Sequence, residues 1–383
     1  MSEAPRAATP VLGIAGTATA SATMLLLGVV SAFYGPLIPT LEAQFEVSAA
    51  TAGTVVSAQF VGFLLGVVLV LRSTGVLAHR QLLTLSTMLM SAGMIGFAVA
   101  PNWPLLLVST VLLGTGFGGL DLGINTMMAA GFGERSGALI NLVNGLFGAG
   151  AVLGPVLVAL FPRMGLYLGA TLFLLCLLPV LRTAKGGGRG EGDNLPKLVM
   201  SRPLLFFALA YLGYLGVESG TTAWLPTQVR ALGLPDTMVT LTASGFWLAA
   251  MVGRFAAVPI ALRVSVRQLV LGCCALTVVG LLLASVPVAP HVMAPLGYVI
   301  VGLGAGPIFP TGLVWVGQQC PRSPRAASAV VALASVGGIL IPPLLGVVVE
   351  GVGPQWVSLF VAGIAVAMLG AFLAAGAVRE PLG

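Results

Sequence analysis

Charged side chains are scarce in this sequence. Lys, Arg, Asp and Glu together make up 7% of the 383 residues, whereas hydrophobic residues make up 58%. An ordinary soluble domain carries roughly 25% charged residues. The mean hydropathy of +1.07 points in the same direction. The composition therefore excludes an ordinary soluble protein, and we expect a lipid bilayer to be the main solvent of the chain.

Histidine and cysteine are also rare, with two and four residues. His79 and His291 fall at the edges of apolar segments on opposite sides of the predicted membrane, so they cannot share a zinc cluster or a Ser/His/Asp site. The cysteines lie in or beside apolar segments without metal-ligand spacing, at Cys176, Cys273, Cys274 and Cys320. We interpret them as small packing residues. We therefore predict that the protein is not an enzyme and needs no metal or cofactor.

Long apolar segments are abundant. Each is about twenty residues long, enough to cross roughly 30 Å of hydrocarbon while satisfying its own backbone hydrogen bonds. The predicted spans are 12–40, 50–71, 78–100, 103–130, 137–161, 165–182, 203–228, 238–262, 266–286, 290–318, 325–349 and 355–378. Because the first apolar run is far longer than the core of a signal peptide, we interpret it as a span. The sequence thus predicts an all-α polytopic membrane protein of twelve helices.

The positions of Lys and Arg predict the orientation. With the N-terminus in the cytoplasm, the cytoplasmic side receives Arg6, Arg72, Arg80, Arg135, Arg182, Lys185, Arg189, Lys197, Arg202, Arg263, Arg267, Arg322, Arg325 and Arg379. Only Arg163 and Arg230 then lie outside. We expect a multi-pass protein of the cytoplasmic membrane with both termini inside. The net charge of +6 is then a topology signal that can attract lipid headgroups, and it implies no nucleic-acid partner.

The chain repeats itself about a polar middle. Residues 183–202 contain the Gly-rich, charged stretch 186–193, which is typical of a flexible linker. An offset of about 187 residues aligns Pro39-Thr40 with Pro226-Thr227, Ser57 with Ser244, Gly66 with Gly253 and Arg80-Gln81-Leu82 with Arg267-Gln268-Leu269. One further residue of offset aligns Gly114, Gly116 and Gly118 with Gly302, Gly304 and Gly306, and Pro155 with Pro343. We predict two six-helix halves, 1–182 and 203–383, related by a parallel repeat.

Over its whole length the chain resembles the major facilitator superfamily. The resemblance rests on the six-plus-six layout, the basic loops after the second and eighth spans, and the Gly/Pro-rich segments 145–155 and 337–343. The short-loop motif of that family is degenerate here, with Arg72, Gly75, His79 and Arg80 in one half and Gly253-Arg254 with Arg263 in the other. Its acidic member is missing from both halves. The resemblance implies a monomeric carrier of a small solute, with two halves rocking about a central site.

Polar residues inside the spans are the candidate functional residues, because charge in hydrocarbon is costly and persists mainly beside a cavity or a partner. Asp121 and Asn125 are four residues apart and share a helix face, as do Asn141 and Asn144 at a spacing of three. Glu218 is the other acid. Further amide and aromatic candidates for a substrate site are Gln59, Tyr214, Trp247, Phe309 and Trp315. Amides bind hydroxyl groups and aromatic rings stack on sugars, so this chemistry favours a polyol.

Structural interpretations of the same residues remain open. Asn141 and Asn144 could hold helices together, which is a common role of polar residues in membrane spans. Asp121 could pair with an Arg or a helix terminus, and Glu218 could lie near the outer mouth. We interpret Arg254, near the cytoplasmic end of its span, as structural.

A narrower resemblance links 119–125 and 141–144 to the fucose-permease-like sugar porters. In the second half, Glu218 with 224–227, and 304–310, are similar to the glucose-transporting relatives of that family. This resemblance implies that Asp121 couples proton movement to sugar binding, and that Asn125, Asn141 and Asn144 contact the sugar. Fucose permeases carry a second carboxylate in helix one, where this chain has Gly35. Asp121 and Glu218 could share the coupling, sodium could replace the proton, or the carrier could be a uniporter.

We therefore expect a transporter of a small polar solute, a sugar above all, with Asp121 as the principal coupling acid. A drug or metabolite exporter of the same fold would use Asp121 for proton antiport. A membrane-embedded enzyme or lipid scramblase is disfavoured by the repeat and by the shortage of catalytic groups.

Overall fold

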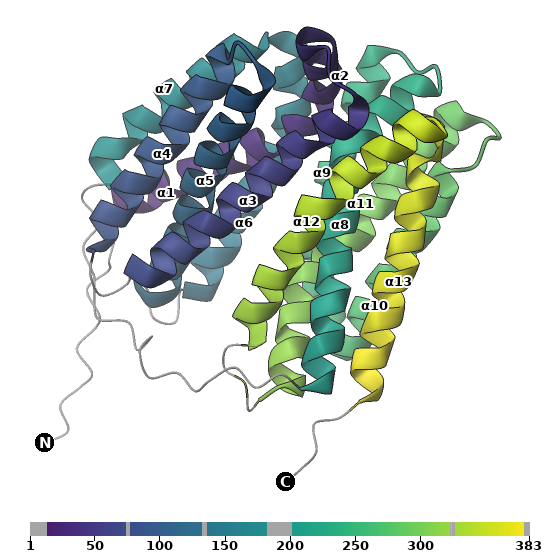
Figure 1. The fold of residues 1–383 in the computed structure, drawn as a ribbon. Helices are drawn as coiled ribbons and strands as arrows, with labels where there is room; N and C mark the ends of the chain where they lie inside the picture. Colours follow the sequence, from purple (N-terminus) through teal and green to yellow (C-terminus); the bar gives the residue numbers. More distant parts are fainter. Residues whose placement is uncertain are drawn as a thin grey trace, which may run out of the picture.

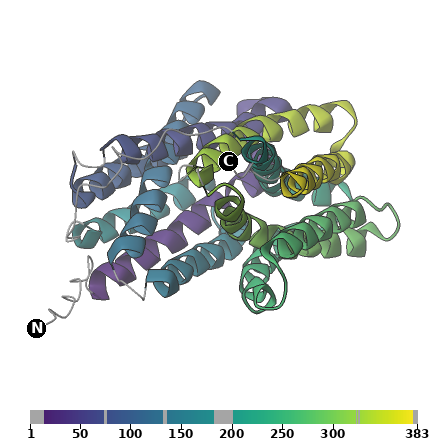
Figure 2. The ribbon, with the colours of Figure 1, turned by 90° about the horizontal axis from the view of Figure 1, so that it is seen from below.

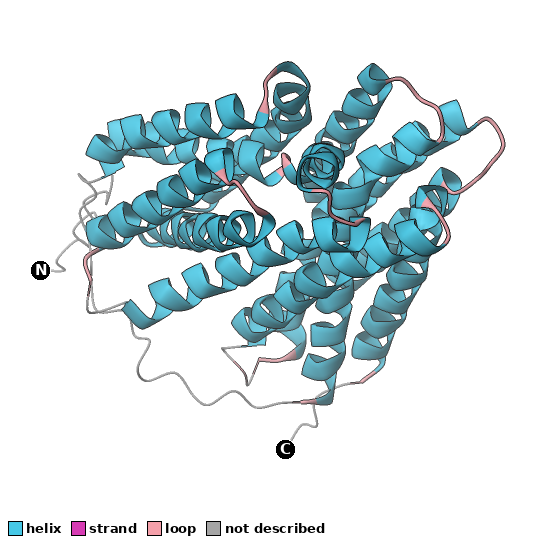
Figure 3. Ribbon diagram, turned by 45° about the horizontal axis from the view of Figure 1, so that its top comes forward, coloured by secondary structure: helices cyan, strands magenta, loops and turns pink. Residues whose placement is uncertain are grey.

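The computed structural model describes residues 14–73, 77–131, 136–181, 201–321, 323 and 326–378. This part of the chain is folded almost entirely into helices (Figure 3). They are α1 (Ile14–Ser31), α2 (Tyr34–Phe45), α3 (Ala49–Ser73), α4 (His79–Val99), α5 (Trp103–Gly131), α6 (Ser136–Leu160), α7 (Arg163–Leu181), α8 (Arg202–Ala231), α9 (Asp236–Ala261), α10 (Val266–Ala284), α11 (Pro290–Gln319), α12 (Ala326–Gly351), the 3₁₀ helix η3 (Pro354–Trp356) and α13 (Val357–Ala377).

The helix lengths agree with the predicted membrane spans. In the described part of the chain, 11 helices are long and apolar enough to cross a bilayer, and the shorter apolar stretch Arg163–Pro179 of α7 corresponds to the remaining predicted span. The prediction of an all-α polytopic protein with twelve spans is confirmed. The linker predicted at 183–202 lies outside the described residues apart from its last two positions, as do nine of the predicted cytoplasmic Lys and Arg residues.

The first predicted span differs from the structure in one respect. It is divided into α1 and α2, with Ala32 and Phe33 between them. Pro36 explains the division, because proline has no N–H to donate to the carbonyl of Ala32 and its ring crowds that oxygen. Tyr34 and Gly35 are therefore the first residues of a new helix.

The helices form two groups, α1 to α7 and α8 to α13, which lie beside each other (Figure 2). Glycine allows close packing at aligned positions in the two groups. A Cβ atom on Gly114 of α5 would lie 2.4 Å from the carbonyl oxygen of Gln59 on α3. At the aligned Gly302 of α11, it would lie 2.3 Å from the carbonyl oxygen of Phe246 on α9. Such small residues let helix backbones approach closely in membranes.

The two groups touch through α3 with α12, α6 with α9, and α2 with α8. In Figure 1 their helices converge toward the end of the bundle where α2 ends and α3 begins, and diverge toward the opposite end. We call the first end the converging end. There, a Cβ on Gly53 would lie 2.8 Å from the carbonyl oxygen of Pro342, and one on Gly346 would lie 2.6 Å from that of Ala49. The two groups are therefore in backbone contact at the converging end.

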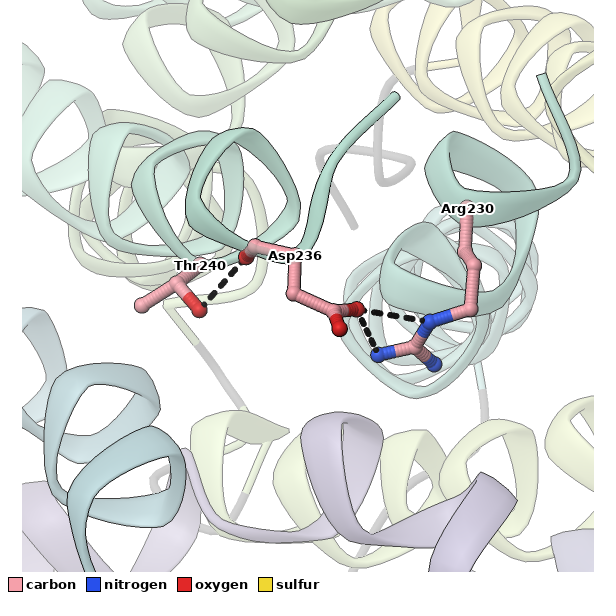
Figure 4. A network of polar contacts seen from close by, with 3 residues as sticks. All are labelled: Arg230, Asp236 and Thr240. Atoms are coloured by element: carbon pink, nitrogen blue, oxygen red, sulfur yellow. Dashed lines mark hydrogen bonds and ion pairs between the residues drawn. The ribbon is translucent and has the colours of Figure 1, made fainter. Parts of the chain in front are cut away.

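A surface ion pair spans the turn between α8 and α9. The Nε and Nη2 atoms of Arg230 donate to Oδ1 of Asp236 at 3.0 and 2.8 Å, and the Thr240 hydroxyl donates to the Asp236 backbone oxygen at 3.0 Å (Figure 4). The two charged side chains are 46% and 81% exposed, so solvent screens the pair and its contribution to stability is small. It fixes the local turn and takes no part in the interior site.

Candidate substrate site

A cavity of about 260 Å³ lies between the two groups of helices. This is slightly below the roughly 300–1,000 Å³ of pockets for drug-sized ligands, which suits a small solute. Its walls come from both groups, with Ser31, Ala32, Tyr34, Gly35, Val56, Gln59, Phe60, Phe63, Phe117, Asp121 and Phe147 from the first and Tyr214, Leu215, Glu218, Ser219, Thr222, Ala223, Trp247, Arg254, Phe309, Val331 and Ser335 from the second. A relative movement of the two groups would therefore change the distances between the two sides of the site.

Asp121 on α5 lines the cavity and begins a chain of hydrogen bonds that leads away from it. Nδ2 of Asn125 donates to Oδ1 of Asp121 at 3.2 Å and to its backbone oxygen at 3.0 Å. Nδ2 of Asn144 on α6 then donates to Oδ1 of Asn125 at 3.0 Å. Asn125 and Asn144 are not among the cavity-lining residues. In this conformation the two amides connect α5 to α6 behind Asp121, and the side chain of Asn141 lies outside the described part of the structure.

Glu218 on α8 lines the same cavity and faces Arg254 on α9. Nη2 of Arg254 lies 4.0 Å from Oε1 of Glu218, and its Nε donates to the carbonyl oxygen of Gly306 at 3.1 Å. That oxygen lacks its usual helical donor because the residue four positions later is Pro310. Arg254, interpreted from the sequence as structural, supports α11 through this bond and also lines the cavity. Its position inside a span was the signal available in the sequence.

Gln59 on α3 is held by a tyrosine from the start of α2. The Tyr34 hydroxyl donates to Oε1 of Gln59 at 2.8 Å, and both side chains line the cavity. With its oxygen engaged in this bond, the amide keeps its NH₂ group as the donor it can offer to a solute.

Aromatic rings make up much of the cavity wall. Among the predicted residues, Tyr214, Trp247 and Phe309 line it, and the rings of Tyr214 and Phe309 lie 5.8 Å apart. Sequence reasoning missed five further rings, that of Tyr34 and those of Phe60, Phe63, Phe117 and Phe147. A phenylalanine in an apolar span is no more polar than its neighbours. Only its position along one helix face could have suggested that it lines the cavity.

Trp315 corrects one prediction, because its ring lies away from the cavity. It is 4% exposed and stacks on Phe372 with ring centroids 5.9 Å apart, and it meets Phe207 edge-on at 5.2 Å. Six residues separate it from Phe309, which turns it by about 120° to another face of α11. Trp315 is therefore a packing residue within the second group of helices.

Six of the predicted site residues thus surround one cavity, namely Gln59, Asp121, Tyr214, Glu218, Trp247 and Phe309. Glu218 shares this cavity with Asp121, and its carboxylate side chain is 19% exposed.

Comparison with known proteins identifies the family. The model of the Major Facilitator Superfamily matches residues 20–322 and 207–382. The chain belongs to this superfamily. It is accordingly a multi-pass transporter rather than an enzyme, and the resemblance predicted from its layout is confirmed.

Its curated relatives include a sugar carrier. The chain is 25% identical over 346 residues to the glucose/mannose transporter GlcP of Bacillus subtilis (strain 168), which covers 84% of each protein. It is also 24% identical over 343 residues to an uncharacterized MFS-type transporter of Yersinia pestis, covering 86% of this chain and 88% of that protein. The resemblance to the glucose-transporting branch is thus matched by a characterised relative.

Solved structures agree on the fold. The nucleoside transporter NupG superposes with a TM-score of 0.76 at 15% identity, covering 94% of this chain and 99% of that one. A D-xylose-proton symporter gives 0.75 at 15% identity, with 94% and 96% covered. The fucose:proton symporter FucP of E. coli gives 0.68 at 15% identity, with 96% and 99% covered.

Proposed function

We propose that this transporter carries a sugar, most simply a monosaccharide, across the cytoplasmic membrane by alternating access. The observation that carries the proposal is the cavity between the two groups of helices, whose wall combines Asp121, Glu218 and the Gln59 amide with aromatic rings. Carboxylates accept hydrogen bonds from hydroxyl groups, and the amide donates to their oxygens. Aromatic faces cover the C–H surface of a sugar ring.

The relatives narrow the choice of solute for testing. GlcP is a glucose/mannose transporter, and two of the similar folds belong to symporters of xylose and fucose. Glucose, mannose, xylose and fucose are therefore the first four candidates.

The mechanism follows from how the two groups touch. Their backbones touch at the converging end, at Gly53 with Pro342 and at Gly346 with Ala49, while the cavity takes residues from both groups. Rocking of one group against the other would open the converging end and bring the diverging ends together, which exposes a central solute to each side in turn. From the distribution of Lys and Arg we further propose that the diverging ends face the cytoplasm, together with both termini.

Asp121 is our candidate for the coupling acid. Its described polar partner is the neutral amide of Asn125, whereas Glu218 has the guanidinium of Arg254 at 4.0 Å. A carboxylate beside a cation keeps its charge more easily than one beside an amide. Asp121 is thus the better placed of the two to alternate between neutral and charged forms, with a proton as the first ion to test and sodium as the second.

Counterflow in proteoliposomes tests the function directly. Vesicles containing the full chain and preloaded with one unlabelled sugar should accumulate that sugar in radiolabelled form transiently, while protein-free vesicles should not. The absence of counterflow with all four sugars would remove the sugar assignment, and a broader panel of polar solutes would then be needed.

One observation favours a second function, export of an apolar cation. Five phenylalanines line the cavity, at Phe60, Phe63, Phe117, Phe147 and Phe309, beside two carboxylates. Such a wall also attracts cations through the faces of its rings. Release of protons from the purified protein on addition of a lipophilic cation, without any response to sugars, would support the exporter.

A further inference from the structure

Two adjacent prolines leave carbonyl groups of α12 without their helical donors. Pro342 and Pro343 lie inside the helix, and neither has an N–H for the carbonyl four residues earlier. Pro343 thereby frees the oxygen of Ile339. Inside a membrane span, where water is scarce, such an oxygen requires another donor.

The donor comes from the other group of helices. The hydroxyl of Ser57 on α3 donates to the carbonyl oxygen of Ile339. A serine within a helix commonly bonds back to a carbonyl of its own preceding turn. Here it instead crosses the boundary between the groups to the one carbonyl that Pro343 has freed. The bond therefore exists only while α3 and α12 are in contact.

Close backbone packing surrounds this bond on the converging side. Gly53, one turn before Ser57, lies against the backbone of Pro342 and Pro343, where a Cβ would come within 2.8 Å. At the ends of the same helices, Oε1 of Glu350 accepts a hydrogen bond from the Ala50 N–H at 2.6 Å. The Glu350 carboxylate thus lies beside the first turn of α3, where the helix dipole favours a negative charge.

The internal repeat supplies a matched comparison. Ser57 aligns with Ser244 of α9, Pro343 with Pro155 of α6, and Ile339 accordingly with Ala151. α6 and α9 form the other long contact between the groups. Yet the Ser244 hydroxyl is buried and has no hydrogen-bond partner in the structure. The aligned serines and prolines are thus the same residues, but only one of the two bonds is present.

We propose that Ser57 is a gate residue of the transport cycle. Its bond to the freed Ile339 oxygen holds the converging end closed, and opening that end must break the bond. Ser244 has no such effect on the closed form. The inference rests on the proposed alternating access but on no particular solute, so the gate is tested without sugar.

Distance measurements between the two groups provide the test. Spin labels are placed at Gln44→Cys on α2 and Val352→Cys after α12, which are both exposed at the converging end. The background is the full chain in lipid nanodiscs with its four native cysteines replaced. Pulsed electron resonance then gives the ratio of the short-distance to the long-distance population.

We expect Ser57→Ala to raise the ratio of the long-distance to the short-distance population about fivefold, the change that loss of one net hydrogen bond produces. Ser57→Thr, which keeps the hydroxyl, should behave like the unmodified chain. Ser244→Ala should not shift the population toward the long distance. In a Pro343→Ala background, where residue 343 regains an N–H for Ile339, Ser57→Ala should have a smaller effect.

Unchanged distances in Ser57→Ala, or an equal shift in Ser244→Ala, would overturn the proposal. Thermal unfolding of each variant separates a shifted gate from a damaged fold. Sugar counterflow, measured separately, reports on the proposed function. If Ser57→Ala shifts the distances as expected but no counterflow is measured, the gate proposal stands and the sugar assignment is wrong. If counterflow is measured but the distances are unchanged, the sugar assignment stands and the gate proposal is wrong.

Discussion

Polar side chains that line the cavity use part of their hydrogen-bonding capacity on other groups of the protein. Gln59 uses its oxygen to bind Tyr34, and Arg254 uses its Nε to bind Gly306. In each case a hydrogen bond to a neighbouring protein group fixes the orientation of a side chain that lines the cavity. Fixed orientation lowers the entropic cost of binding a small ligand. If the cavity is the substrate site, we therefore expect its specificity to depend on groups that position its polar side chains.

Tyr34→Phe tests this dependence. The ring and its packing against Phe97 remain, but the donor to Gln59 is lost, so the amide can rotate. We expect the KM for the transported sugar to rise about three- to tenfold, the worth of one net hydrogen bond, with little change in the maximal rate. Initial rates of uptake over a range of sugar concentrations measure both quantities. A lower maximal rate at constant KM would instead assign Tyr34 to the conformational change.

The pair of Glu218 and Arg254 should behave as a unit. Arg254→Gln leaves the Glu218 carboxylate without a nearby cation and weakens the support of the Gly306 oxygen. We expect it to lower the free energy of unfolding by about 1–3 kcal/mol. The double variant with Glu218→Gln should recover part of the loss because no unpaired charge remains. Thermal melts of the wild type, both single variants and the double variant complete the cycle, and strict additivity would contradict the pairing.

At the scale of helices, length and hydropathy predicted the spans because a bilayer imposes both. The break between α1 and α2 was missed, since Pro36 and Pro39 are compatible with either a kink or a division. The site was predicted where polarity stood out, at Asp121 and Glu218. Four phenylalanine rings of the wall were missed and Trp315 was wrongly included, because the sequence does not say which face of a fully apolar helix meets which neighbour.

Glycine at the helix contacts gives a prediction at this scale. A Cβ on Gly114 would lie 2.4 Å from the Gln59 carbonyl oxygen, which is backbone and cannot move aside, whereas one on Gly272 would meet nothing within 4 Å. Gly114→Ala should therefore lower the free energy of unfolding by about 1–3 kcal/mol, as overpacking does. Gly272→Ala should be neutral or slightly stabilising, because alanine favours the helix. The melting temperatures of the two variants in detergent test this. Equal values would indicate that α3 and α5 can separate freely.

For the molecule as a whole, the proposed function requires a link between the cavity, the proposed rocking motion and an ion. Coupling requires the ion and the solute to change each other's affinity, and this effect is reciprocal. Asp121 lies in the cavity wall and is connected through Asn125 to Asn144 on α6. Because α6 packs against α9 of the other group, a change of charge at Asp121 could be transmitted to an interface that moves in the proposed cycle. Glu218 faces Arg254 within the second group.

Replacing Asp121 with Asn should separate transport from accumulation. The amide keeps the size of the side chain and its ability to accept from Asn125, but it holds the site permanently neutral. Exchange of labelled for unlabelled sugar should therefore survive, while accumulation driven by a pH gradient should vanish, because the proton no longer binds and leaves during the cycle. Both are measured in the same proteoliposomes, with and without the gradient, and Glu218→Gln serves as the matched variant. Gradient-driven accumulation that persists in Asp121→Asn but disappears in Glu218→Gln would transfer the role to Glu218. If the wild type accumulates sugar under neither a proton nor a sodium gradient, the carrier is a uniporter, and neither acid couples an ion to the solute.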